Sequence, residues 1–180
     1  MSEKPLVIVG KGMAWSRAED EVRAFIERTK LPFLASPMGK GVMDDTHPLS
    51  VGAARSHALQ EADVIFLMGA RLNWIMHFGK PPRFNKDVKI IQLDIAHEAI
   101  SQNVPAEVAL VGDGKAIVGQ LNKALENRQW FYPKDTPWRA AIAAKESIAT
   151  RPATTNANRP ILDTPLQPGR PVCHARPKPG

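Results

Sequence analysis

Cysteine is nearly absent, since Cys173 is the only one among 180 residues. This excludes an internal disulfide framework and any zinc site that needs two or four cysteines. No apolar run approaches the roughly 18 residues that a membrane span needs. The N-terminal residues also lack the long apolar stretch and the small-residue cleavage site of a secretory signal. We therefore expect a soluble intracellular protein without a membrane span.

Aromatic residues are also few, at 6%, yet hydrophobic residues make up 43% and charged residues 23% of the chain. A chain of this composition can bury a core. The formal net charge of +6 would suit a nucleic-acid partner. However, residues 151–180 hold five basic side chains and only one acidic side chain, so most of the net charge belongs to this segment. We therefore expect no nucleic-acid partner.

Short apolar runs alternate with stretches of helical spacing, and this alternation predicts the fold. Ala18, Val22, Phe25 and Ile26 share one face of a predicted helix, and further helices are expected over 53–60 and after Gly112. Strands and helices in this order predict an α/β fold with an open, doubly wound, Rossmann-like parallel sheet. Ligands of such sheets bind beyond the carboxyl ends of the strands. The five predicted strands are residues 5–9, 31–35, 63–68, 89–95 and 107–111.

The chain divides by composition into three parts. Residues 1–128 form the predicted α/β domain, and residues 129–150 form a predicted linker with a short Ala-rich helix. Residues 151–180 hold seven of the sixteen prolines and no Phe, Trp or Tyr. Because this last segment shows no periodicity either, we expect it to be a disordered Pro/Arg-rich tail.

Gly10, Lys11 and Gly12 follow the first predicted strand and begin like a Gly-x-Gly-x-x-Gly dinucleotide fingerprint. Trp15 occupies the last position of the pattern, where glycine normally lets the helix approach the strand. Two interpretations remain. The amides of the turn and Lys11 could contact an anionic group, or the segment could be a plain turn between strand and helix.

Arg71 and Asp94 each lie near the end of a predicted strand, so we expect both at the ligand-binding edge of the sheet. A guanidinium suits phosphate or an adenine face, and a carboxylate suits ribose hydroxyls. Alternatively, the two side chains pair with each other or with loop groups.

Arg55 and Ser56 lie near a predicted helix start, and Lys40 lies between two glycines. Either segment could contact phosphate, although a solvated helix face and a flexible loop are the simpler interpretations. The histidines at 47, 57, 77 and 97 have no spacing typical of a metal site, and we predict no metal ligands. No arrangement typical of nucleophilic catalysis is present, so we predict no catalytic residues in this chain.

Nine segments of the chain form a recognisable set of motifs: residues 9–12, 31–34, 38–42, 47–48, 52–56, 62–65, 69–74, 91–95 and 111–113. Together they resemble the central domain of 2-hydroxyacyl-CoA lyases, and many of them are shared with oxalyl-CoA decarboxylases. The resemblance covers residues 4 to about 126. The motif over residues 69–74, together with His77-Phe78-Gly79, looks specific to this branch.

The resemblance implies a three-domain enzyme that uses thiamine diphosphate and Mg²⁺, which are held by two other domains. Such enzymes split a 2-hydroxyacyl-CoA into formyl-CoA and a shortened aldehyde, as in fatty acid α-oxidation, and the whole enzymes are homo-oligomeric. The resemblance implies that a eukaryotic member is located in the peroxisome and that any other member is located in the cytoplasm. The sequence ends in Pro177-Lys178-Pro179-Gly180, which is not a peroxisomal C-terminal signal.

The resemblance also implies roles for individual residues. Lys11 would contact a phosphate of ADP, Arg71 the adenine or phosphate side, and Asp94 the ribose. The turn that ends at Gly114 matches a further position at the ADP. Arg55 and Ser56 match a region close to the nucleotide of CoA, so an acyl-CoA is an expected partner.

Two departures from the family pattern leave the enzymatic status of this chain open. Gly112-Asp113-Gly114 imitates the first half of the family's metal-binding motif, in which an asparagine follows further on. Asn156 is too far on and no asparagine lies between residues 128 and 155, so we interpret the segment as a helix N-terminus. Residues 151–180 match nothing in the family, and a truncated gene model with a change near Ala149 is our hypothesis. The isolated chain is then expected to have no lyase activity.

Alternative interpretations are an oxalyl-CoA decarboxylase-type central domain, a non-catalytic interaction module and a flavin-binding relative. A sirtuin-like deacylase would need a four-cysteine zinc module, which one cysteine cannot build.

Overall fold

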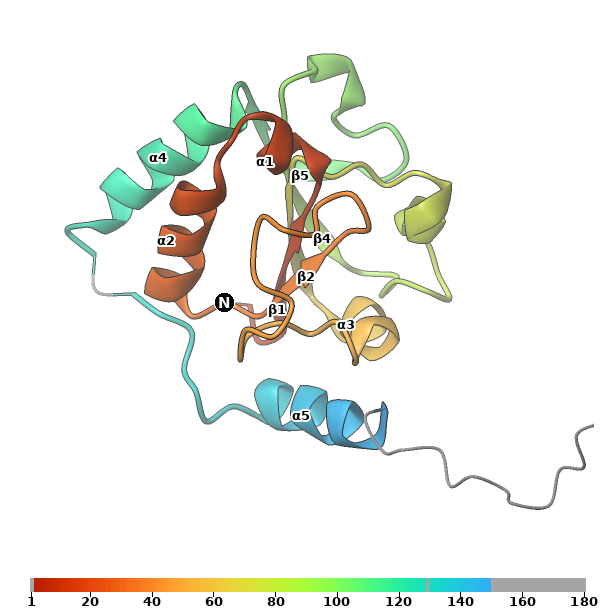
Figure 1. The fold of residues 1–180 in the computed structure, drawn as a ribbon. Helices are drawn as coiled ribbons and strands as arrows, with labels where there is room; N and C mark the ends of the chain where they lie inside the picture. Colours follow the sequence, from red (N-terminus) through yellow and green to blue (C-terminus); the bar gives the residue numbers. More distant parts are fainter. Residues whose placement is uncertain (1, 129, 150–180) are drawn as a thin grey trace, which may run out of the picture.

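The sheet contains five parallel strands in the order β2-β1-β3-β4-β5 (Figure 1). This computed structural model describes residues 2–128 and 130–149. The chain builds β2 on one side of β1 and then continues with β3 on the other side, which is the arrangement of a doubly wound sheet. The predicted fold class is therefore confirmed. The strands are β1 (Pro5–Val9), β2 (Phe33–Ala35), β3 (Val64–Met68), β4 (Lys89–Asp94) and β5 (Ala106–Val111).

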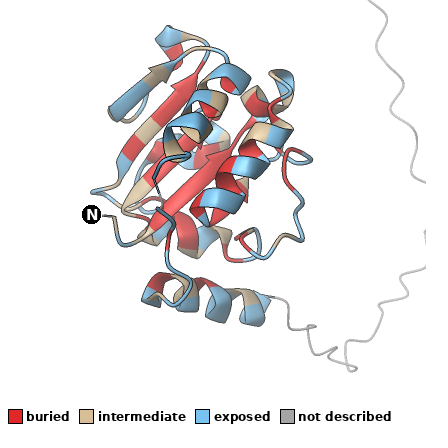
Figure 2. Ribbon diagram, turned by 90° about the vertical axis from the view of Figure 1, so that its left-hand side faces the viewer, coloured by how far each residue is buried: buried red, intermediate tan, exposed pale blue. Residues whose placement is uncertain are grey.

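The central strands are apolar because helices and loops cover both of their faces. Every residue of β1 is buried, whereas β5 lies at the edge and is largely exposed (Figure 2). In register, Val7 of β1 lies beside Phe66 of β3, and Phe66 lies beside Ile91 of β4. This register brings the carboxyl ends of the strands to one edge of the sheet.

Helices α2 and α4 pack side by side on one face of the sheet, and α3 lies on the other side (Figure 1). The predicted apolar face of α2 is confirmed, because Val22, Phe25 and Ile26 are buried. No helix in the described ranges has the length and apolar character needed to cross a membrane. The helices are α1 (Lys11–Trp15), α2 (Glu19–Thr29), α3 (Arg55–Glu61), α4 (Gly114–Leu125) and α5 (Pro137–Ala149), and two 3₁₀ segments cover Trp74–Gly79 and His97–Ala99.

Residues 130–149 return to the beginning of the chain. The hydroxyl of Tyr132 donates to the carbonyl of Glu3 at 2.6 Å, and the indole N–H of Trp138 donates to the carbonyl of Pro5 at 3.0 Å. Helix α5 therefore packs beside the start of β1. The domain boundaries at 128 and 150 stay predictions, and the expected disorder of 151–180 concerns residues outside the described ranges.

Candidate functional site

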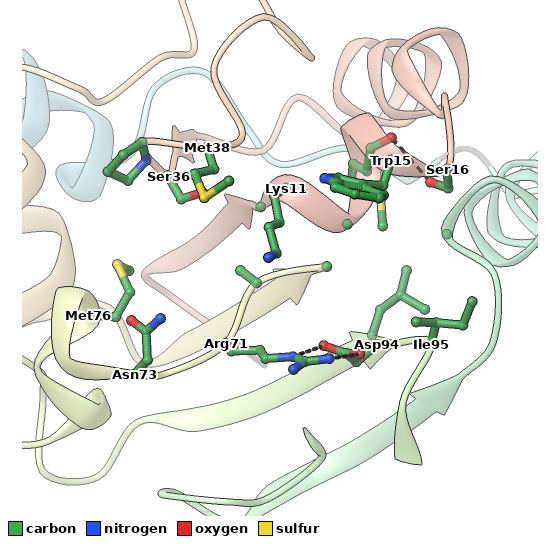
Figure 3. Close-up of a pocket in the computed structure, with 18 of the residues that line it drawn as sticks. Lys11, Trp15, Ser16, Ser36, Met38, Arg71, Asn73, Met76, Asp94 and Ile95 are labelled. Carbon is green, nitrogen blue, oxygen red and sulfur yellow. Dashed lines mark hydrogen bonds and ion pairs between the residues drawn. The ribbon is translucent and has the colours of Figure 1, made fainter. Parts of the chain in front are cut away.

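A cavity of about 630 Å³ lies at the carboxyl ends of the strands (Figure 3). The segment after each of the five strands contributes to its lining, which includes Lys11 after β1, Met38 after β2, Arg71 after β3, Asp94 at the end of β4 and Gly114 after β5. Both the volume and the position are typical of ligand pockets in open α/β sheets. Four of the six predicted site residues, Lys11, Arg71, Asp94 and Gly114, thus meet at one cavity.

The glycines of the first turn serve backbone packing. The amide of Gly10 donates to the carbonyl of Met68 at 2.8 Å, and the amide of Gly12 donates to the carbonyl of Gly69 at 3.0 Å. A Cβ on Gly12 would lie 2.8 Å from the Cα of Gly69, which is closer than real Cβ atoms come. The Gly-x-Gly pattern therefore lets the start of α1 lie close to the turn that follows β3. The expected tight turn is in fact the start of α1 at Lys11.

Lys11 brings a positive charge to the cavity. Its side chain is exposed and points into the cavity in Figure 3. Within the described residues, no hydrogen bond or ion pair engages its ammonium group. The charge of Lys11 is therefore available to an anionic ligand.

Arg71 and Asp94 form a two-fold hydrogen-bonded ion pair across the ends of β3 and β4. Arg71 donates from Nε to Oδ2 of Asp94 at 2.9 Å and from Nη2 to Oδ1 at 3.1 Å, and the amide of Ala96 donates to Oδ1 at 2.9 Å. The pairing considered as an alternative from the sequence is thus present. Because both side chains also line the cavity and the Arg71 side chain is 50% exposed, the pair remains in reach of a ligand.

The ion pair keeps Asp94 charged although only 6% of its side chain is exposed. Burial alone raises the pKa of Asp94, but the hydrogen bonds from Arg71 and the Ala96 amide outweigh burial, so the pKa lies below its ordinary value. The hydrogen bond from Asp94 in turn raises the pKa of Arg71. Oδ2 of Asp94 accepts the hydrogen bond from Nε of Arg71, and a carboxylate oxygen can accept a further hydrogen bond from a ligand hydroxyl.

Gly114 brings the start of α4 against α1. A Cβ at this position would lie 2.3 Å from Cε of Met13 and 2.7 Å from Oγ of Ser16. Asp113 caps the helix, because its Oδ1 accepts the amide of Ala116 at 2.9 Å. The Gly112-Asp113-Gly114 sequence therefore acts as a helix N-terminus here, as we interpreted it from the sequence.

The structure does not bring Arg55 and Ser56 to the cavity. Arg55 lies at the start of α3, where its Nη2 donates to the carbonyl of Ile75 at 3.3 Å and lies 3.5 Å from Sδ of Met76. Since Ile75 and Met76 line the cavity, Arg55 supports the wall from behind. Lys40, the loop candidate, pairs with Asp45 at 3.2 Å and also lies outside the lining.

Sequence reasoning did not identify several wall residues of the cavity. They share one signal, because each lies in a segment that directly follows a strand or continues into the next turn. Their types, mostly apolar or small, gave no chemical reason to select them. The missed residues are Trp15, Ser36, Met38, Asn73, Ile75, Met76 and Ile95.

Comparisons with known proteins identify the family of this chain. Residues 1–121 match the family model described as "Thiamine pyrophosphate enzyme, central domain". The chain belongs to this family. It is 52% identical over 144 residues to 2-hydroxyacyl-CoA lyase 1 of Mus musculus, which is 80% of this chain and 25% of that protein.

Other relatives confirm the predicted branch. The chain is 51% identical over 144 residues to 2-hydroxyacyl-CoA lyase 1 of Homo sapiens, again 80% of this chain and 25% of that protein. It is 47% identical over 127 residues to oxalyl-CoA decarboxylase of Escherichia coli K12, which is 70% of this chain and 22% of the decarboxylase. The chain thus spans about a quarter of the length of these relatives.

The family implies thiamine diphosphate and usually Mg²⁺, but the described residues do not fit this cofactor. They contain no group of three or more His, Cys, Asp or Glu side chains that could hold a metal ion. The carboxylate of Asp113 is engaged as the cap of α4, and the sequence has no asparagine between residues 128 and 155, where the family motif would continue. We therefore derive no catalytic step from these residues.

Proposed function

We propose that the chain is the nucleotide-binding central domain of a 2-hydroxyacyl-CoA lyase and that its cavity binds ADP. The proposed whole enzyme splits a 2-hydroxyacyl-CoA into formyl-CoA and a shortened aldehyde. The identity of about half of the aligned residues to two lyases supports the assignment to this branch.

The observation that carries the nucleotide proposal is one cavity with a free cation and a buried, charged carboxylate. Lys11 has no partner among the described residues and attracts the diphosphate. The Asp94 carboxylate accepts hydrogen bonds from the ribose hydroxyls. Arg71 holds Asp94 in place and presents the exposed part of its side chain to the ligand.

The charge of Asp94 favours ADP over CoA at this cavity. The ribose of CoA carries a 3′-phosphate, whereas the ribose of ADP carries a hydroxyl that can donate to a carboxylate. Because the pKa of Asp94 lies below its ordinary value, the carboxylate is negative at neutral pH and repels a phosphate at the same place. If the chain holds a CoA nucleotide, we expect its position to be elsewhere, with Arg55 and Ser56 as the predicted candidates.

Isothermal titration calorimetry of the full chain with ADP and with CoA tests this proposal. We expect ADP to bind, CoA to bind at least about tenfold more weakly, and Asp94→Ala to weaken ADP binding by about tenfold or more, as for loss of a hydrogen bond to a charged group. Asp45→Ala is the matched control, because this exposed carboxylate lies outside the cavity. Unchanged ADP affinity in Asp94→Ala would contradict the proposed role of Asp94.

Exposed apolar side chains favour a second candidate function, which is a non-catalytic interaction module. Trp74 is 72% exposed, and Phe78 and Phe131 are exposed as well. Absence of any heat with ADP, together with concentration-dependent association in sedimentation experiments, would support this function over nucleotide binding. An oxalyl-CoA decarboxylase-type domain, a peroxisomal location and homo-oligomerisation of the whole enzyme stay predictions.

A further inference from the structure

We propose that Trp15 is the base-stacking wall of the cavity and that it makes the site prefer a purine nucleotide. This inference rests on the proposed function, because it concerns the base of the same nucleotide. It adds a residue to the site that the sequence pattern had marked only as a departure, since Trp15 stands where a dinucleotide fingerprint has its last glycine.

The indole of Trp15 has no role in the core of the described structure. The residue is 81% exposed, and no hydrogen bond from its N–H reaches another described residue. On the same short helix, Met13 is buried and provides the contact with the core. A large exposed apolar ring next to a cavity is a surface that a flat apolar group can cover with a gain in free energy.

The walls of the cavity suit a flat base. Figure 3 shows Trp15 on one side of the cavity and Ile95 on the opposite side, next to Asp94. Ile95 is itself exposed and apolar. A base held between the indole and Ile95 leaves its ribose beside Asp94, and Lys11 points into the same cavity to contact the phosphates. The arrangement therefore matches the order of groups in a nucleoside diphosphate.

Substitution of Trp15 tests the stacking contact by calorimetry of the full chain with ADP. We expect Trp15→Ala to raise the dissociation constant about 5- to 150-fold, the range found when a base-stacking aromatic is replaced by alanine. Trp15→Phe keeps a ring and should raise it much less. Trp74→Ala is the matched control, because Trp74 is similarly exposed and does not line the cavity. Thermal unfolding should show unchanged stability for all three variants.

Two further measurements separate stacking from a general effect on the cavity. Tryptophan emission should be quenched by ADP in the wild-type chain and in Trp74→Phe, and this quenching should be lost in Trp15→Phe. ADP should bind more tightly than UDP, because a purine has the larger stacking surface, and Trp15→Ala should reduce this difference.

The outcomes also separate the two proposals. If the wild-type chain binds ADP but Trp15→Ala binds it equally well, the inference about Trp15 is wrong and the proposed function stands. If the wild-type chain does not bind ADP, the proposed function fails, and the inference fails with it. Equal affinity for ADP and UDP in the wild-type chain would contradict the purine preference alone.

Discussion

At the residue scale, the side chain of His47 links the loop between β2 and α3 to helix α2 through hydrogen bonds. Its Nδ1 accepts the amide of Leu49 at 3.1 Å, so Nε2 carries the hydrogen and donates to Oε1 of Glu27 at 2.7 Å. Lys30 donates to the other oxygen of Glu27 at 2.7 Å. Chiefly the hydrogen bond from Lys30, and then that from His47, lower the pKa of Glu27 to about 2. The same loop supplies Met38 to the cavity.

The lowered pKa predicts a pH-dependent contribution of Glu27 to stability. A carboxyl whose pKa is lower in the folded than in the unfolded chain stabilises the fold above its ordinary pKa of 4.5, and this contribution disappears as the pH falls toward about 2. Because the Glu27 side chain is 48% exposed, we expect at most about 1 kcal/mol. Glu27→Gln should therefore be less stable than wild type in urea unfolding at pH 7 and equally stable near pH 2.

Glu126→Gln provides the control, since this glutamate is exposed and no ion pair with another described residue involves it. A stability difference between Glu27→Gln and wild type that stays constant from pH 7 to pH 2 would contradict the role given to the Glu27 carboxylate.

Arg71 and Asp94 illustrate what the sequence could predict about single residues. Their positions after strands predicted that both lie at one edge of the sheet, and the structure places both at the cavity. The choice between pairing and ligand contact could not be predicted, because it depends on how far apart the ends of β3 and β4 lie and on the side-chain conformations. The position of Trp15 at the cavity was not predicted for a different reason. From the sequence alone, a tryptophan after a strand can be buried in the core or can line a pocket.

At the element scale, small residues decide how closely the segments around the cavity can approach. The sequence predicted the strands and most helices from apolar spacing, because burial dictates that spacing. It did not predict α1, which has only five residues and one buried side chain. The contact of Gly12 with Gly69 could not be predicted either. The two glycines lie 57 positions apart, and the residues around one glycine do not indicate that the other packs against it.

Two glycine substitutions within helices should therefore have opposite effects. Gly12→Ala places a Cβ 2.8 Å from backbone of Gly69, which cannot move aside as a flexible side chain would, so we expect a loss of about 1–3 kcal/mol. Gly119→Ala in α4 meets nothing within 4 Å, so alanine should stabilise the helix by about 0.5–1 kcal/mol. Urea unfolding followed by circular dichroism measures both. Equal stability of the two variants would contradict the close packing of α1 against β3.

At the scale of the whole molecule, helix α5 near the end of the described chain packs against the first strand, β1. Helix α5 contacts α3, where the rings of Trp138 and His57 lie 5.9 Å apart, and Trp138 also bonds to the carbonyl of Pro5 at the start of β1. Composition predicted a helix in this segment, but the partner of that helix could not be predicted, because the contact joins residues 133 positions apart. The cavity lies at the opposite end of β1, after Val9.

Because these two regions lie at opposite ends of the sheet, stability and ligand binding should separate in variants of Trp138. Trp138→Phe removes the hydrogen bond to Pro5 and leaves that carbonyl without its partner, at a cost of about 1–3 kcal/mol. Trp138→Ala also loses the packing of a side chain that is only 3% exposed, so we expect about 3–5 kcal/mol. Trp130→Phe is the control, because Trp130 is exposed.

Urea unfolding followed by circular dichroism measures the stability of the Trp138 variants, and calorimetry with ADP measures the site in those that remain folded. We expect stability to decrease in the order wild type, Trp138→Phe, Trp138→Ala, while the ADP affinity of the folded fraction stays within about twofold of wild type. If Trp138→Phe is as stable as wild type, the hydrogen bond from Trp138 of α5 to Pro5 of β1 does not stabilise the fold. A parallel loss of ADP affinity would mean that the cavity depends on the opposite end of the sheet, contrary to the separation of the two regions in the structure.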